Sequence, residues 1–98
     1  MKDLETIINK LSKNLPELKK RFSIERIGIF GSYSTGFNDE KSDIDILVEF
    51  KETPDIFEFI RLKRNLSKLL NRHVDLVTKK AIKEKFKNRI LSEVKYLQ

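Results

Sequence analysis

The chain has 98 residues, of which 37% are charged, and its 21 basic and 15 acidic side chains give a net charge of +6. One domain, residues 1–98, accounts for this length and buries only about 60–68% of its unfolded surface, so a partner would add stability. The sequence has no cysteine for disulfides or thiolate metal sites, no apolar run near the ~20 residues of a membrane span, and no signal-peptide pattern, which favours the cytoplasm.

The first predicted element is an amphipathic helix from Asp3 to about Phe22. Its apolar residues recur at helical spacing and are Leu4, Ile7, Ile8, Leu11, Leu15 and Leu18. Pro16 removes a backbone donor and crowds the preceding turn. The segment therefore forms either one helix or two short ones that divide after Asn14.

A short buried strand containing Ile27, Ile29 and Phe30 follows, and it ends at Gly31-Ser32. Gly31 permits a close backbone approach where a side chain would obstruct it. If Ser32 opens a short helix, its hydroxyl and the first unpaired backbone N–H groups form a phosphate site. We therefore predict that this turn binds phosphate.

Two aspartates, Asp43 and Asp45, come next in a segment that alternates as a strand does. Alternation places both carboxylates on one face and Ile44 and Ile46 on the other. Carboxylates this close repel unless a cation lies between them, and Mg²⁺ prefers oxygen ligands shared with substrate phosphates. The sequence therefore predicts a metal site.

A loop at residues 51–55 precedes a strongly apolar helix with Ile56, Phe57, Phe59, Ile60, Leu62, Leu66, Leu69 and Leu70. A strand with Asp75 between Val74 and Leu76 follows it. If this strand lies beside the Asp43–Asp45 strand, three carboxylates meet and can hold two metals. His73 shares the face of Asp75 but is interpreted as a surface histidine rather than a ligand.

The last predicted helix runs from Ala81 to about Tyr96. Its apolar stripe consists of Ile82, Phe86, Ile90, Leu91 and Val94, with lysines elsewhere. The order helix, strand, strand, helix, strand, helix gives an α/β (α+β) fold, a small mixed sheet backed by helices. The basic run from Lys79 to Arg89 is interpreted as a solvated face, so nucleic-acid binding is possible but not favoured.

The spaced motif resembles a known family. Gly31-Ser32, ten residues, then Asp43-x-Asp45 is similar to the signature of the DNA polymerase β-type nucleotidyltransferase superfamily. The length and the Val-Asp-Leu-Val strand around Asp75 resemble its minimal nucleotidyltransferase (MNT) branch. The resemblance implies a polymerase β-like nucleotidyltransferase fold and extends from Ile24 to the C-terminal helix.

The resemblance also implies residue roles. It assigns Gly31 and Ser32 to triphosphate binding, and Asp43, Asp45 and Asp75 to catalysis and to two Mg²⁺ ions, with ATP as substrate. Members of this branch are typically encoded beside a HEPN-domain toxin, and some transfer AMP to a tyrosine of that partner as antitoxins. Where Arg and Glu are common in the family, this chain has Thr35 and Phe37, so phosphate contacts near the turn are in question.

Two other functions remain open at this point. The acceptor could instead be a small molecule or an RNA end, although no acceptor-binding domain accompanies the core. Alternatively, the chain could be a non-catalytic antitoxin that masks its partner by contact, against which the three acids argue. Apolar residues on the terminal helices are candidate partner contacts, namely Leu11, Leu15, Ile90 and Leu97.

Overall fold

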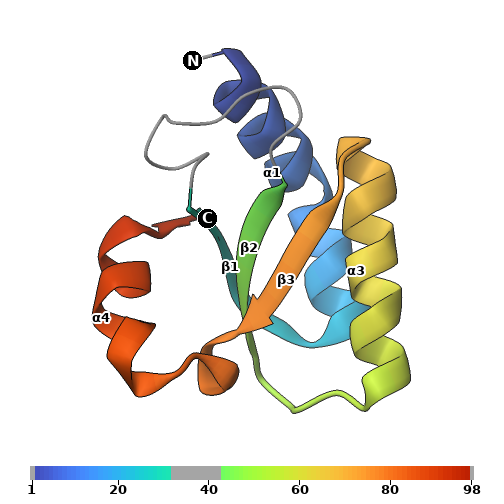
Figure 1. The fold of residues 1–98 in the computed structure, drawn as a ribbon. Helices are drawn as coiled ribbons and strands as arrows, with labels where there is room; N and C mark the ends of the chain where they lie inside the picture. The colour runs from blue at the N-terminus through green and yellow to red at the C-terminus, as the bar shows by residue number, and fades with distance from the viewer. Residues whose placement is uncertain (1, 32–42, 98) are drawn as a thin grey trace.

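A mixed sheet forms the centre of the computed structural model, which describes residues 2–31 and 43–97. Within these residues four strands, β1 (Ile24–Phe30), β2 (Ile44–Phe50), β3 (Val74–Thr78) and β4 (Lys95–Tyr96), lie in the order β3-β2-β1-β4. β1 is antiparallel to β2 and β4, whereas β2 and β3 are parallel. The predicted small mixed sheet backed by helices is confirmed (Figure 1).

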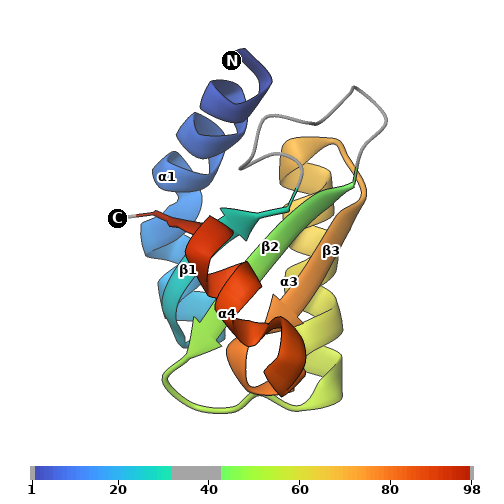
Figure 2. The same cartoon turned by 60° about the vertical axis from the view of Figure 1, so that its left-hand side comes forward.

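Helices cover the two faces of this sheet unequally. α1 (Lys2–Phe22) and α3 (Ile56–Leu70) pack side by side on one face, whereas the shorter α4 (Glu84–Glu93) lies over the other (Figure 2). α3 connects the parallel strands β2 and β3, as a crossover helix must. Among the described elements, the short α4 covers less of its face than α1 and α3 cover of theirs.

α1 is one continuous helix, which decides between the two arrangements that Pro16 left open. Pro16 is exposed, while Leu15 and Leu18 on either side of it are 2% and 6% exposed. A proline inside a helix costs about 3 kcal/mol, and burial of two leucines at about 1.5–3 kcal/mol each offsets that cost. Core packing therefore keeps the helix intact across the proline.

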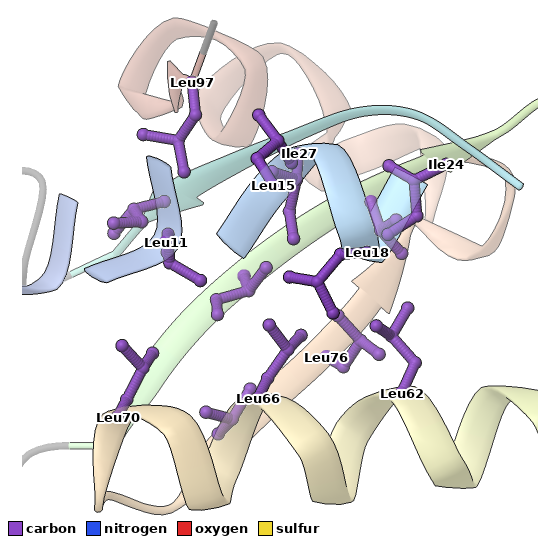
Figure 3. Close-up of a cluster of buried hydrophobic side chains, with 14 of the residues drawn as sticks. Leu11, Leu15, Leu18, Ile24, Ile27, Leu62, Leu66, Leu70, Leu76 and Leu97 are labelled. Carbon is purple, nitrogen blue, oxygen red and sulfur yellow. The ribbon is translucent and has the colours of Figure 1, made fainter. Parts of the chain in front are cut away.

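The core lies between the sheet and the pair α1 and α3. Side chains from both helices interdigitate with those of the strands (Figure 3). Leu11, Leu15 and Leu97, which the sequence suggested as partner contacts, are buried here, and Ile90 is half-buried, so that suggestion is wrong for the three leucines. Among the described residues, no helix is both long and apolar enough to cross a membrane.

The C-terminal segment differs from the single helix predicted for Ala81–Tyr96. A short 3-10 turn, η1 (Lys79–Ala81), precedes α4, and β4 follows it. Val94 is extended, with φ −68° and ψ 135°, and Leu97 N donates to Ile27 O at 2.8 Å. Pairing with the open edge of β1 thus outweighs the helical periodicity that continued to Tyr96.

Candidate active site

Two aspartates lie side by side on the sheet face that is turned away from α1 and α3, which we call the site face. The register pairs Phe30 of β1 with Asp45 of β2, and Asp45 with Asp75 of β3. Ile44 and Ile46 are fully buried on the core face, so the alternating Asp45 points to the site face. The strands therefore bring two of the predicted acids together, while the roles of these acids stay predictions.

The Asp45 carboxyl shares a side-chain hydrogen bond with Asp75. Burial, the negative charges of Asp75 and Asp43, this hydrogen bond and the charge of Glu93 raise the pKa of Asp45 from 3.8 to about 6. Two carboxyl groups in contact need a shared proton or a cation. Above pH 6 this proton is largely lost, and the two negative charges then repel each other unless a cation lies between them.

Asp43, which directly precedes β2, is turned toward His73. Its Oδ1 lies 3.2 Å from His73 Nδ1, and both side chains are more than half exposed. Among the described residues, no group of three His, Asp or Glu side chains lies close enough together to hold a metal ion. Exposed pairs contribute only about 0–1 kcal/mol, so little opposes the movement of Asp43 toward Asp45.

Gly31 brings the backbone against the Asp45 carboxylate. It has φ +74°, and a Cβ at this position would overlap Oδ2 of Asp45 and lie 3.1 Å from its Cγ. The backbone conformation and the available space therefore both require glycine. Gly31, the residue that follows β1, therefore lies directly against the Asp45 carboxylate of β2.

The change Gly31→Ala is expected to displace the Asp45 carboxylate. The left-handed conformation costs a residue with a Cβ roughly 1–2 kcal/mol, and the methyl group occupies the place of Oδ2. We expect ATP affinity in Mg²⁺ to fall by at least about tenfold, the equivalent of about 1.4 kcal/mol. Calorimetry measures the affinity and a thermal melt reports the strain; unchanged ATP affinity would separate Gly31 from the site.

α4 and the residues that follow it lie over part of the site face (Figure 2). Val94 packs on Gly28, where a Cβ would meet Val94 Cγ2 at 2.6 Å. The preceding residue, Glu93, adds its charge to the field at Asp45, and Arg89 Nε lies 4.0 Å from Glu93 Oε1. The sequence analysis missed Glu93, because its position depends on the pairing of β4 with β1.

Three residues of the sequence prediction lie outside the described residues. They are Ser32, predicted to bind triphosphate, and Thr35 and Phe37, which replace residues common in the resembling family. The assignment of Ser32 therefore stays a prediction from the motif. The described part of the site consists of Gly31 and the three aspartates.

The raised pKa of Asp45 predicts how stability depends on pH without metal. Between about pH 4 and 6 the folded chain holds a proton that the unfolded chain releases, so the free energy of unfolding falls as pH rises through this window. Asp45→Asn removes this dependence. Urea unfolding in EDTA should show the variant to be more stable than wild type at pH 8 and equal to it near pH 4; equal stability at pH 8 would contradict the raised pKa.

Residues 8–97 match the family model of the nucleotidyltransferase domain. The chain is also 43% identical, over 97 residues, to protein adenylyltransferase MntA of Thermococcus cleftensis. This match spans 99% of the chain and 98% of the relative. The similarity therefore includes every described residue of the site.

Two solved structures have a similar fold. One is a toxin-antitoxin with AMP-PNP, with a TM-score of 0.76 and 29% identity over 93% of this chain and 72% of that one. The other is the tri-AMPylated HEPN toxin of Shewanella oneidensis in complex with MNT antitoxin, with a TM-score of 0.62 and 28% identity over 98% and 69% of the two chains. These structures relate the fold to a triphosphate analogue and to an AMPylated protein.

Proposed function

Because the chain belongs to the nucleotidyltransferase domain family, and within it to the minimal nucleotidyltransferases, we propose that it transfers AMP from ATP to a tyrosine of a HEPN-domain toxin and so acts as its antitoxin. The observation that carries the proposal is the contact of Asp45 with Asp75 beside the turn at Gly31. This contact places paired carboxylates beside the turn whose motif predicts phosphate binding. The named relatives support protein as the acceptor.

The donor set fits magnesium. It offers only carboxylate oxygens, and the raised pKa of Asp45 beside Asp75 marks a place where a cation relieves repulsion. Asp43, Asp45 and Asp75 would hold two Mg²⁺ ions, which when bound neutralise the triphosphate and lower the pKa of the acceptor hydroxyl. To take this role, the Asp43 carboxylate would leave its pairing with His73.

The chain's own residues position the triphosphate and deprotonate the acceptor hydroxyl. The acceptor oxygen bonds to the α-phosphorus of ATP, the bond from that phosphorus to the bridging oxygen breaks, and pyrophosphate leaves. Asp75 is exposed on the site face and takes the proton of the acceptor hydroxyl. The turn at Gly31, with Ser32 as predicted from the motif, holds the triphosphate, and positioning supplies most of the rate.

Intact-mass analysis of the HEPN protein, incubated with this chain, ATP and Mg²⁺, tests the proposal. Its mass should rise by whole adenylyl units, and peptide mapping should place them on tyrosine. Omission of Mg²⁺ is one control. Replacement of ATP by its α,β-methylene analogue, in which the bond between the α-phosphorus and the bridging group cannot be cleaved, is the other. A toxin that is inhibited without any change of mass would favour an antitoxin that acts by contact alone.

A further inference from the structure

The outward face of α3 carries apolar side chains where a surface helix normally presents polar ones. The helix buries Leu62 and Leu66 on its core face, whereas Phe57 and Ile60 point away from the core. Phe57 is 70% exposed, Ile60 is 41% exposed and the neighbouring Ile56 is 66% exposed. We call these three side chains the α3 patch.

The fold does not account for the α3 patch. Asp55 already caps the helix, because its carboxylate accepts a hydrogen bond from Glu58 N at 2.8 Å. Isoleucine and phenylalanine are weaker helix formers than lysine or glutamate, so neither helix propensity nor core packing favours them here. An exposed apolar patch of this kind is typical of a protein interaction site.

Cations continue the same face toward the end of α3. Arg64 and Lys68 follow Ile60 at intervals of four residues, and both are exposed. The only acidic residue of α3, Glu58, is paired with Arg61 at 2.6 Å. Within the described residues Arg64 and Lys68 have no carboxylate partner, which leaves two positive charges for a binding partner.

A pocket of about 210 Å³ lies at the end of the molecule where α3 begins. Its walls include Phe50, Thr53 and Pro54 together with Lys79 and Lys80. Thr53 and Pro54 immediately precede the capping residue of α3, so the pocket and the patch share one end of the molecule. The pocket adds an apolar recess. Lys79 Nζ lies 3.8 Å from Glu49 Oε1, which also lines the pocket, so among the described residues Lys80 is the pocket lysine without a carboxylate partner.

We propose that the α3 patch docks an amphipathic helix of the HEPN-domain protein, with an apolar face flanked by aspartates and glutamates. The three apolar side chains of the α3 patch are at helical spacing and suit packing against another helix. The cations of α3 and of the pocket favour a helix with acidic residues beside its apolar face. The partner's identity rests on the function proposed above. The chemistry of the docked helix rests on the α3 patch and on the cations beside it.

The docking surface and the acid site lie on different sides of the molecule. α3 covers the core face of the sheet, whereas Asp45 and Asp75 lie on the site face (Figure 1). A helix bound to the α3 patch therefore leaves the carboxylates open to ATP and to an acceptor tyrosine. Retention of the toxin and transfer of AMP become separable properties.

The double variant Phe57→Glu with Ile60→Glu tests the docking surface. Glutamate is a good helix former, so the variant should keep the wild-type melting temperature and ATP affinity in Mg²⁺. Binding of the purified HEPN protein, measured by calorimetry, should weaken by at least about 100-fold, as the loss of two central anchors does. Phe86→Glu is the matched control, since Phe86 is 40% exposed but lies on α4, and it should bind as wild type does.

Arg64→Glu should weaken the same binding by about tenfold, and the loss should shrink at high salt. Unchanged binding by the folded double variant would overturn the proposal, as would a wild-type chain that does not bind the HEPN protein. Self-association of the chain that the double variant abolishes, or binding to RNA instead, would also overturn it. Lost binding without any AMP transfer by wild type would support the docking surface and contradict the proposed activity.

Discussion

Asp43→Asn and Asp45→Asn should each abolish AMP transfer while the protein stays folded. Either change removes a carboxylate charge from the pair of acids that the motif places beside the triphosphate, and we expect a loss on the order of 10³-fold or more in rate. Transfer of label from α-³²P-ATP to the HEPN protein measures it. The effect on the fold is small because Asp43 is exposed and Asp45 faces the open side of the sheet.

Asp55→Asn is the matched control for these two variants. It makes the same chemical change at an aspartate of α3, where asparagine caps a helix as well as aspartate does. Transfer and melting temperature should therefore match wild type. If Asp45→Asn transferred AMP at the wild-type rate, the assignment of the site would be wrong.

Asp75→Asn should slow the chemical step far more than it weakens ATP binding. Asp75 is exposed on β3 beside Asp45. In the proposed reaction it takes the proton of the acceptor, and a positioned base contributes about 10²- to 10⁴-fold to a rate. We expect single-turnover transfer to fall by that factor. ATP affinity in Mg²⁺ should change by no more than about tenfold, or about 1.4 kcal/mol.

Rapid-quench kinetics measures the rate of single-turnover transfer, and calorimetry with AMP-PNP measures the nucleotide affinity. Asp43→Asn provides the comparison, because it should lower nucleotide affinity as well as the rate. A large loss of affinity in Asp75→Asn with an unchanged rate would exchange the roles that we assign to Asp43 and Asp75.

Strand periodicity predicts the face of the sheet on which Asp45 and Asp75 lie. Alternation around Asp45 and around Asp75 placed both carboxylates opposite buried Ile or Leu residues, and the register of β2 with β3 brings them together. The apolar helix between the two strands was equally clear, because its length suits a crossover between parallel strands. These features follow from the spacing of apolar residues, which repeat every 2 residues in the strands and about every 3.6 residues in the helix.

What the sequence did not predict depends on contacts between distant segments. β4 pairs with β1, although the two strands are far apart in the sequence. This pairing ends α4 at Glu93 and brings the Glu93 carboxylate toward Asp45. The pair of His73 with Asp43 likewise depends on two strands lying side by side. Helical periodicity also does not separate buried from exposed apolar residues: Leu11 is fully buried and Phe57 is 70% exposed, although both fit the apolar spacing of their helices.

Crystals grown with AMP-PNP and Mn²⁺ would test the central claim most directly, since manganese replaces magnesium at oxygen ligands and scatters anomalously. The account predicts two anomalous peaks among the carboxylates of Asp43, Asp45 and Asp75, with the triphosphate beside Gly31 and Asp43 turned away from His73. Peaks elsewhere, or a nucleotide bound without manganese at Asp45 and Asp75, would contradict it.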